Sequence, residues 1–453
     1  MKKIVSNALY VLFFGFTLTL VIACVLLIVN ISNGEGQSYH DIEAVQISGS
    51  AEESASYRAV TVKVHDNTTG GFLPIPNTYG YDALQQDNDK QRFLYSQLME
   101  SVYSVSDTPD ENGHYRLSRI RVRGRHLTEF DIRQVVNAFI SDHPEYFWIE
   151  NLFGYAYSDE DTIVEFYSVL SASECNRYIK RFNSHIDAIL QQVPDGLNEY
   201  QREKQIHDVL LGQCTYKTGV TTTADGWQYF TAYGAIVEGE AVCEGYAKSL
   251  QLLLSRVGIP CVMIRGDAGG VAHMWNAVEL GGEWYHVDPT WDDNDTEGNI
   301  SYEYFNLTSD AIGRNHTICE NIANLVGTEE SDRIDPLVRY NFYVPMCNQK
   351  AMNYYYVEGT LIQQCDAQTD ELLTQVIYDR AIAKEMYIPL RFGTQMPFSG
   401  YINKLFNESP YLFYICLENV NARLDAQHKI DMGSVSILKN EADLTLRVRL
   451  KYL

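Results

Sequence analysis

The sequence predicts an α+β protein in which one membrane-spanning helix precedes a central domain flanked by two smaller α/β domains. Three observations support this fold class: a long apolar run near the N-terminus, strand and helix patterns that alternate through most of the chain, and a central helix followed by a two-strand hairpin. The chain has 453 residues, of which 45% are hydrophobic and 21% are charged. At roughly 100–200 residues per domain, this length suggests two or three domains. Such a composition can bury cores, which excludes a wholly disordered protein.

The apolar run covers residues 8–31 and is expected to anchor the protein in a membrane. It is 24 residues long without a charge, whereas a helix needs about 20 residues to span the hydrocarbon core and a cleaved signal has an apolar region of only about 7–15. Lys2 and Lys3 place the N-terminus in the cytoplasm, so residues 33–453 should lie outside the cell membrane. The residues before Cys24 weakly resemble a lipoprotein processing site, but the apolar run continues beyond it.

The net charge limits the partners of this exported part. The chain has 35 Lys+Arg and 59 Asp+Glu, and a nucleic-acid binder would need a basic face to displace counterions from phosphates. We therefore expect no nucleic-acid partner. The acidic excess also repels anionic lipid headgroups, so the expected membrane contact is the N-terminal helix alone.

Composition and periodicity divide the chain into five parts. We expect an anchor at 1–32, a flexible linker at 33–55, an α/β domain at 56–192, a central domain at 193–332 and a second α/β domain at 333–453. In the first α/β domain, Val60, Val62 and Val64 alternate as in a strand, and Ser171 with Glu174 predicts a capped helix start. The aromatic-rich residues 143–148 fit a packed helix-to-strand turn, with a ligand contact as the alternative. In the last domain, residues 354–356 are expected to begin a strand, 387–392 to form one, and 435–453 to form two.

A helix that begins at Cys243 is the first chemical landmark. Apolar residues recur at helical spacing from Ala247 to Val257, and Gly258 then ends the pattern. Unpaired amides and the positive dipole end at a helix start stabilise a thiolate. A buried structural cysteine is the commoner role for an isolated free cysteine, and for Cys243 considered alone that alternative stays open.

A hairpin brings a histidine and an aspartate together. Gly281-Gly282 is a two-residue turn signal between two strand patterns, so Leu280 should face Glu283. In this register His273 and Asp288 lie diagonally on one sheet face, within side-chain reach. A carboxylate beside an imidazole fixes its tautomer and stabilises the imidazolium.

These residues together predict acyl transfer. Cys243 would attack an amide carbonyl, His273 would move the proton, and Asp288 would orient His273. The Cys243 amide is one expected oxyanion donor, and a second is expected among the upstream residues Trp227, Gln228 and Tyr233.

The ordered motifs around Cys243, His273 and Asp288 resemble the transglutaminase-like superfamily, most of all its bacterial extracellular members. The resemblance covers about 140 residues, roughly 195–330, and it implies a papain-like core in which a helix-borne cysteine packs on an antiparallel sheet. The superfamily includes protein cross-linkers, peptidases, amidases and inactive modules. The expected function is therefore extracellular cysteine acyl transfer on peptide or protein amides, either hydrolysis or transamidation. The alternative is a catalytically inactive cell-surface binding or scaffolding protein.

No cofactor or metal is expected. The nine cysteines have no zinc spacing, and they are too sparse for a disulfide framework, although one or two bridges stay possible. A zinc site made of Cys243, His273, His286 and Asp288 is not favoured, because the two histidines lie two hairpin rows apart. The acidic residues 292–298 resemble the start of a calcium loop, but Tyr304 stands where the closing Glu belongs.

Overall fold

The computed structural model describes most of the chain beyond the predicted anchor. The described residues are 42–47, 57–65, 72–84, 89–124, 126–158, 160–220, 222–223, 226–294, 299–319 and 341–453. They belong to two compact units, Met1–Gln349 and Lys350–Leu453. Among these described residues, no helix is long and apolar enough to cross a membrane. The predicted anchor at residues 8–31 lies outside them.

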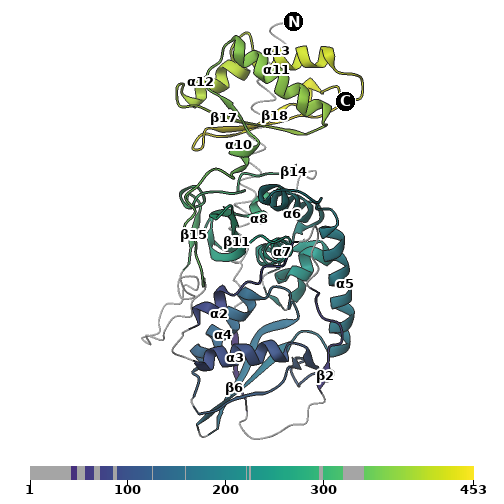
Figure 1. Ribbon diagram of the computed structural model, residues 1–453, viewed down its shortest axis with the longest axis vertical. Coiled ribbons are helices and arrows are strands. Elements are labelled where there is room, and N and C mark those ends of the chain that lie inside the picture. The colour runs from purple at the N-terminus through teal and green to yellow at the C-terminus, as the bar shows by residue number, and fades with distance from the viewer. Residues whose placement is uncertain are drawn as a thin grey trace. The chain divides into compact units, whose positions relative to one another are not determined.

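The N-terminal part of the first unit is built around one β-sheet (Figure 1). Its strands run in the order β1-β6-β7-β4, and β5 also pairs with β7. The strands are β1 (Glu43–Gln46), β4 (Tyr115–Arg116), β5 (Ile120–Val122), β6 (Ile149–Ser158) and β7 (Asp161–Ser168). The helices packed on it are α2 (Tyr79–Ala83), α3 (Asp89–Ser101) and α4 (Glu129–Asp142). Buried side chains such as Leu94, Val135 and Phe166 join the helices to the sheet in one apolar core.

The segment predicted as a strand at Val60, Val62 and Val64 is different in the structure. Strand β2 (Tyr57–Ala59), paired with β3 (Ser104–Ser106), ends before it. The amides of Thr61 and Val62 donate to Oδ1 of Asn176 at 2.8 and 2.9 Å. These backbone donors therefore bind a side chain instead of a neighbouring strand, and the strand prediction is wrong here.

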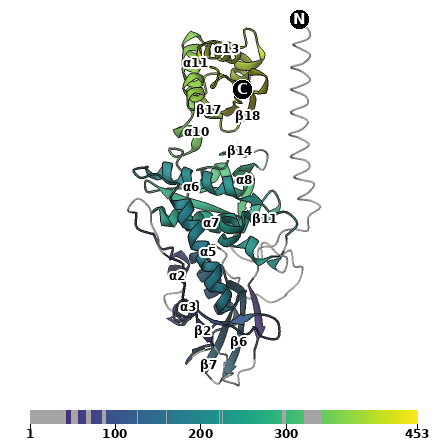
Figure 2. The same cartoon turned by 90° about the vertical axis from the view of Figure 1, so that its right-hand side faces the viewer.

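Helix α5 (Ala172–Leu190) links the two parts of the first unit, and Figure 2 shows it running past both. It contacts β3 and also α7 (Cys243–Arg256) of the central part. Ser171 accepts from the Glu174 amide, and the Glu174 side chain accepts from the Ser171 amide. The predicted capping box is thus confirmed. The predicted domain boundary at 192/193 falls between α5 and α6 (Glu199–Gln213).

The second sheet carries the central part. Its order is β12-β11-β10-β15, with every neighbouring pair antiparallel. The strands are β10 (Cys261–Ala268), β11 (Val271–Leu280), β12 (Glu283–Val287) and β15 (His316–Ile318). Helix α7 (Cys243–Arg256) packs on β10 and β11. Around this core lie β8 (Thr215–Tyr216), η2 (Trp227–Phe230), η3 (Gly234–Glu238), β9 (Glu240–Ala241), α8 (Pro289–Asp292), β13 (Asp293–Asn294), β14 (Asn299–Ile300) and α9 (Ser309–Ile312).

The predicted hairpin register is confirmed from Leu280↔Glu283 to Asn276↔Val287. Its extension to Asp288, which placed His273 and Asp288 diagonally on one sheet face, is wrong because β12 ends at Val287. Asp288 instead caps α8, whose first residue is Pro289. Proline has no backbone N–H for a sheet ladder, and its fixed φ suits the first turn of a helix.

The second unit, Lys350–Leu453, is a smaller α/β fold. Its sheet has the order β16-β17-β19-β18. Its elements are α10 (Tyr354–Val357), β16 (Thr360–Ile362), α11 (Ala367–Ile382), β17 (Tyr387–Phe392), α12 (Phe398–Ile402), η5 (Asn403–Asn407), α13 (Leu412–Arg423), η6 (Met432–Ser434), β18 (Ser436–Asn440) and β19 (Thr445–Arg449). Leu373 of α11, Phe413 of α13 and Leu446 of β19 share one buried core. The predicted strands β17, β18 and β19 are confirmed.

Two segments have a different local structure from the one that the sequence predicted. Residues 43–46, placed in the flexible linker, form β1 and pair with β6 in parallel. Residues 354–356, expected to begin a strand, form α10, because the Asn353 side chain accepts from the Tyr355 amide and starts a helix. The predicted boundary at 332/333 lies outside the described residues, and the two units divide after Gln349.

Candidate active site

Cys243 is the first residue of α7 and is 6% exposed. It packs against Ala247 of the same helix and against Met263 and Met274 of the two central strands. Val242, the N-cap residue, makes no side-chain cap hydrogen bond. The amides of the first turn are therefore not capped by that side chain, which is the setting that favours a negative charge at a helix start.

Gly245 lets the upstream segment approach the start of α7. A Cβ at this position would lie 2.7 Å from the carbonyl oxygen of Tyr229 and 3.0 Å from that of Thr231. Both oxygens belong to backbone, which cannot move aside as a flexible side chain does. Because Gly245 has no side chain, η2 can lie against the first turn of α7, two residues after Cys243.

His273 and Asp288 are in direct contact, as the hairpin argument expected. Nε2 of His273 lies 2.7 Å from Oδ2 of Asp288. The other carboxylate oxygen, Oδ1, accepts from the amides of Thr290 and Trp291 at 3.0 and 3.2 Å. Burial raises the pKa of the Asp288 carboxyl, but His273 and its other donors outweigh burial and hold that pKa well below its usual range.

The His273 ring interacts with Cys243 as well as with Asp288. Burial lowers the pKa of the ring, but the charge and hydrogen bond of Asp288, together with a side-chain interaction with Cys243, raise that pKa to about 10. Because Nε2 donates to Asp288, Nδ1 is the ring nitrogen left for Cys243. The structure therefore brings all three predicted residues together through the central imidazole.

His316 also belongs to this site, and sequence reasoning missed it. Its Nε2 lies 3.0 Å from Oδ2 of Asp288, the same oxygen that His273 contacts. It is a lone histidine on the three-residue strand β15, which reaches the site by pairing with β10. No spacing in the sequence marks this pairing.

His273, Asp288 and His316 are also the buried residues whose ligand atoms could surround a metal ion. Those three atoms lie within 4.8 Å of one another. However, each imidazole already contacts Oδ2 at a distance of a direct hydrogen bond, so the three side chains satisfy one another without an ion. The cluster therefore fits a proton-sharing network as it stands.

His286, a member of the unfavoured zinc set, faces another environment. Its Nδ1 accepts from the Trp275 indole at 3.2 Å, and its Nε2 lies 3.3 Å from the Ser309 hydroxyl. Burial, followed by the charge of His316, lowers the pKa of His286 to about 4. His286 is therefore a neutral ring that supports the sheet.

The two acidic residues beside Cys243 are both paired with lysines. Nζ of Lys217 lies 2.9 Å from a carboxylate oxygen of Glu240, and Nζ of Lys248 lies 2.6 Å from one of Glu244. Lys248 also donates to the carbonyl of Phe230 on η2, at 3.1 Å. Each negative charge beside the thiol is thus offset locally.

The three candidate oxyanion donors differ in their surroundings. Tyr233 is buried, packs against Phe147 and receives a hydrogen bond from Arg181 at 3.3 Å. Trp227 stacks on the same Phe147 ring, with centroids 6.2 Å apart. Gln228 lies on η2, the element that Gly245 admits beside α7. Trp227 lies on η2 as well, so what separates Gln228 from the two aromatic residues is that their rings pack on Phe147.

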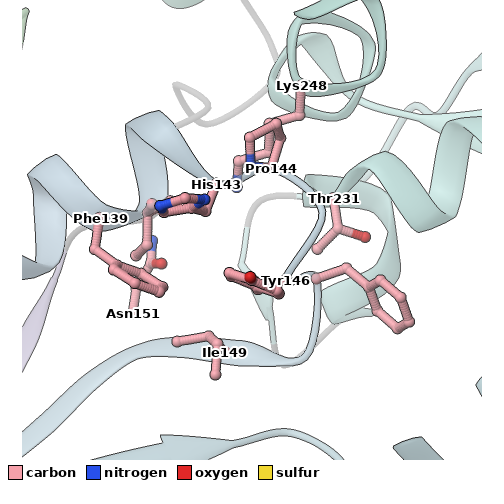
Figure 3. Close-up of a pocket in the computed structure, with 10 residues that line it drawn as sticks. Phe139, His143, Pro144, Tyr146, Ile149, Asn151, Thr231 and Lys248 are labelled. Carbon is pink, nitrogen blue, oxygen red and sulfur yellow. The ribbon is translucent and has the colours of Figure 1, made fainter. Parts of the chain in front are cut away.

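A pocket lies where the N-terminal and central parts of the first unit meet, and its lining includes Phe147. Figure 3 shows His143, Pro144 and Tyr146 of the N-terminal part and Thr231 and Lys248 of the central part around this pocket. Nδ1 of His143 lies 2.9 Å from a carboxylate oxygen of Glu145. The segment 143–148 forms the predicted turn between α4 and β6, and this turn packs against the central part.

The comparisons with known proteins concern this central part. A family model for the transglutaminase-like superfamily matches residues 187–289. No curated protein matches the chain. Among solved structures, the chain is similar to a TGase, at 16% identity over 38% of this chain and 50% of the other, with a TM-score of 0.22.

Two further solved structures are similar to this chain. A proposed cysteine protease from Cytophaga hutchinsonii has 16% identity over 29% of this chain and 52% of its own, with a TM-score of 0.21. A proposed protease from Parabacteroides distasonis has 7% identity over 67% of this chain and 62% of its own, with a TM-score of 0.20. The chain thus spans about half the length of the TGase and of the Cytophaga protein, and superpositions this weak carry no argument about activity.

Proposed function

We propose that the protein transfers acyl groups from peptide or protein amides through Cys243, His273 and Asp288, since a family model for the transglutaminase-like superfamily matches residues 187–289. The observation that supports the proposal most is the contact of His273 Nε2 with Asp288 Oδ2 at 2.7 Å, beside a helix that begins at Cys243. A cysteine, an imidazole and an orienting carboxylate are the groups that acyl transfer needs.

The proposed reaction has two steps. The Cys243 sulfur bonds to the amide carbon while His273 holds the thiol proton, and that proton then leaves with the amine as the C–N bond breaks. In the second step water or a lysine amine attacks the thioester and gives a proton to His273, and the sulfur leaves as the thiolate. Water as the acceptor gives a peptidase or amidase, whereas a lysine amine gives a cross-linker.

The cationic form of His273 suits this role. With a pKa raised to about 10, the ring holds its proton at neutral pH and can stabilise a thiolate at Cys243. The oxyanion of the tetrahedral intermediate would be held by the Cys243 amide, with Gln228 as the second donor. We also propose that this reaction takes place outside the cell, in the part of the chain that follows the membrane anchor expected at residues 8–31.

An activity screen of the full-length protein tests the proposal. The purified chain is incubated with a library of glutamine-containing peptides, with and without a fluorescent primary amine, and products are read by mass spectrometry. We expect hydrolysed or amine-linked peptides, which Cys243→Ser abolishes and Cys261→Ser does not. If the wild type and Cys243→Ser give the same product profile in both conditions, a binding or scaffolding role replaces the enzymatic one.

A further inference from the structure

Both carboxylate oxygens of Asp288 are fully used in the buried centre of the site. Oδ1 accepts from the amides of Thr290 and Trp291. Oδ2 accepts from His273 at 2.7 Å and from His316 at 3.0 Å. Asp288 is 0% exposed, so bulk water does not stand in for a donor that is lost.

We propose that His316 is a positioning residue for the acyl transfer proposed above: its Nε2–H holds the Asp288 carboxylate so that Oδ2 points at Nε2 of His273. This inference rests on the proposed function. The hydrogen-bond contacts of His316 are with Asp288 and Asn315, so it acts on the reaction through Asp288 and His273.

The His316 ring is itself held on several sides. Its backbone pairs with Ala268 of β10, and its Nδ1 lies 2.7 Å from Oδ1 of Asn315. The Asn315 amide nitrogen in turn donates to the Tyr304 hydroxyl oxygen at 2.7 Å. With contacts at both nitrogens the ring cannot turn without breaking one of them. Nε2 is therefore fixed toward Asp288.

A fixed donor matters because a carboxylate can rotate about its broad χ2 torsion. Because the carboxylate is planar, donors on either oxygen hold the same torsion: the amides of Thr290 and Trp291 through Oδ1, and the two histidines through Oδ2. Hydrogen bonds in such a buried network strengthen one another. Without His316, Oδ2 would keep His273 alone as its side-chain donor, and the carboxylate would hold the His273 ring less firmly.

The competing explanation is that His316 only fills space. Its ring packs against Trp275 with centroids 5.0 Å apart and against Trp291 with centroids 4.7 Å apart. Two substitutions separate the roles. His316→Phe keeps an aromatic ring and removes the donor, whereas His316→Gln removes the ring and keeps an amide N–H near the position of Nε2.

The test compares these two variants in the full-length protein with His286→Phe as the matched control. His286 is also a buried histidine of this sheet and contacts Trp275, but its nitrogens bond Trp275 and Ser309. The first readout is the rate at which iodoacetamide alkylates Cys243, which needs no substrate. The second is turnover of a peptide found in the activity screen, separated into kcat and KM.

We expect His316→Phe to lower kcat and the Cys243 alkylation rate roughly tenfold to a hundredfold and to leave KM nearly unchanged. A loss of this size is typical when a residue that orients a functional side chain is removed. His316→Gln should recover most of that loss, and His286→Phe should stay near the wild type. The inference is overturned if Phe preserves the rates while Gln loses them, or if both variants match the wild type or are equally impaired. Failure of the proposed function looks different, because the wild type itself would then show neither turnover nor selective alkylation.

Discussion

Lys248 and Glu244 form an ion pair one helical turn apart on α7, directly after Cys243, with 2.6 Å between Nζ and the carboxylate oxygen. The two side chains are only 8% and 6% exposed. A like charge this close would disfavour a thiolate. The lysine removes that conflict, and its second bond, to the Phe230 carbonyl, ties the pair to η2.

Breaking this pair should destabilise the protein. Lys248→Met leaves the Glu244 carboxylate buried and unpaired, which typically costs about 3–5 kcal/mol of unfolding free energy. The double variant Lys248→Met/Glu244→Gln should restore most of it, because the buried charge is gone. Urea unfolding followed by tryptophan fluorescence measures both.

The exposed pair on the other side of Cys243 is the control for that experiment. Lys217 and Glu240 are 30% and 43% exposed, and exposed pairs contribute about 0–1 kcal/mol. Lys217→Met should therefore change stability by less than about 1 kcal/mol. Equal losses in Lys248→Met and Lys217→Met would show that burial does not distinguish the pairs.

Asp288→Ala should impair turnover far more than His286→Ala. Loss of an orienting carboxylate can cost on the order of 10⁴ in rate, and Asp288 is the carboxylate that contacts His273. His286 contacts Trp275 and Ser309 instead. Initial rates on one peptide substrate decide the point, and a more damaged His286 variant would mean that the site is organised differently.

Stability should fall as the pH rises above neutrality because of His207. Burial lowers the pKa of this ring, but the carboxylates of Asp208, 3.3 Å from Nδ1, and Asp292, 3.4 Å from Nε2, raise it to about 9. A pKa above the unfolded value of about 6.5 means that the folded state holds the proton more tightly. The resulting stabilisation is complete below about pH 6.5 and is lost as the pH rises through 9.

Urea unfolding at a series of pH values tests this dependence, with His207→Gln as the comparison. The wild type should lose unfolding free energy between about pH 6.5 and pH 9. The variant should show a shallower slope over the same interval. Parallel slopes for the two proteins would assign the pH dependence to other groups, of which His273 is the first to examine because its pKa is raised in the same direction.

The membrane topology gives a further prediction. Residues 33–453 should lie outside the membrane, because Lys2 and Lys3 precede the uncharged apolar run at 8–31. Protease added to intact cells should degrade the large domains. Their survival until the cells are lysed would contradict the expected orientation.

Local patterns predicted much of the fold, and long-range pairing limited the rest. Gly281-Gly282 set the hairpin rows, and Ser171 with Glu174 set the start of α5, because each signal acts within a few residues. The proline after Asp288 ended β12 one residue earlier than the extended register required. The contact of His273 with Asp288 survived this change because Asp288, as the N-cap of α8, still directs Oδ2 at the ring.

Residues that reach the site from distant segments were beyond the sequence patterns. His316 joins Asp288 through a three-residue strand that pairs with β10, and a strand this short has no readable periodicity. The same holds for β1, whose four residues pair with β6 more than 100 positions later in the chain. The sequence predicted only that Lys248 lies in a helix. Its buried bond to the Phe230 carbonyl could not be predicted, because Phe230 belongs to a separate segment.

The central claim is that Cys243 is a nucleophile activated by His273, and competition among the cysteines for a limiting reagent tests it most directly. All eight cysteines in the described part of the chain are free. Burial raises the pKa of Cys175 and Cys347 to about 12 and also raises that of Cys261, Cys319, Cys365 and Cys416. These six thiols should therefore react slowly in the folded protein.

The measurement is a brief pulse of limiting iodoacetamide on the folded full-length protein at about pH 6.5, where an ordinary thiol is about 1% ionised, followed by peptide mapping. The account predicts labelling confined to Cys243 and lost in His273→Ala. Equal labelling of several cysteines, or none at Cys243, would contradict it and favour a binding or scaffolding role.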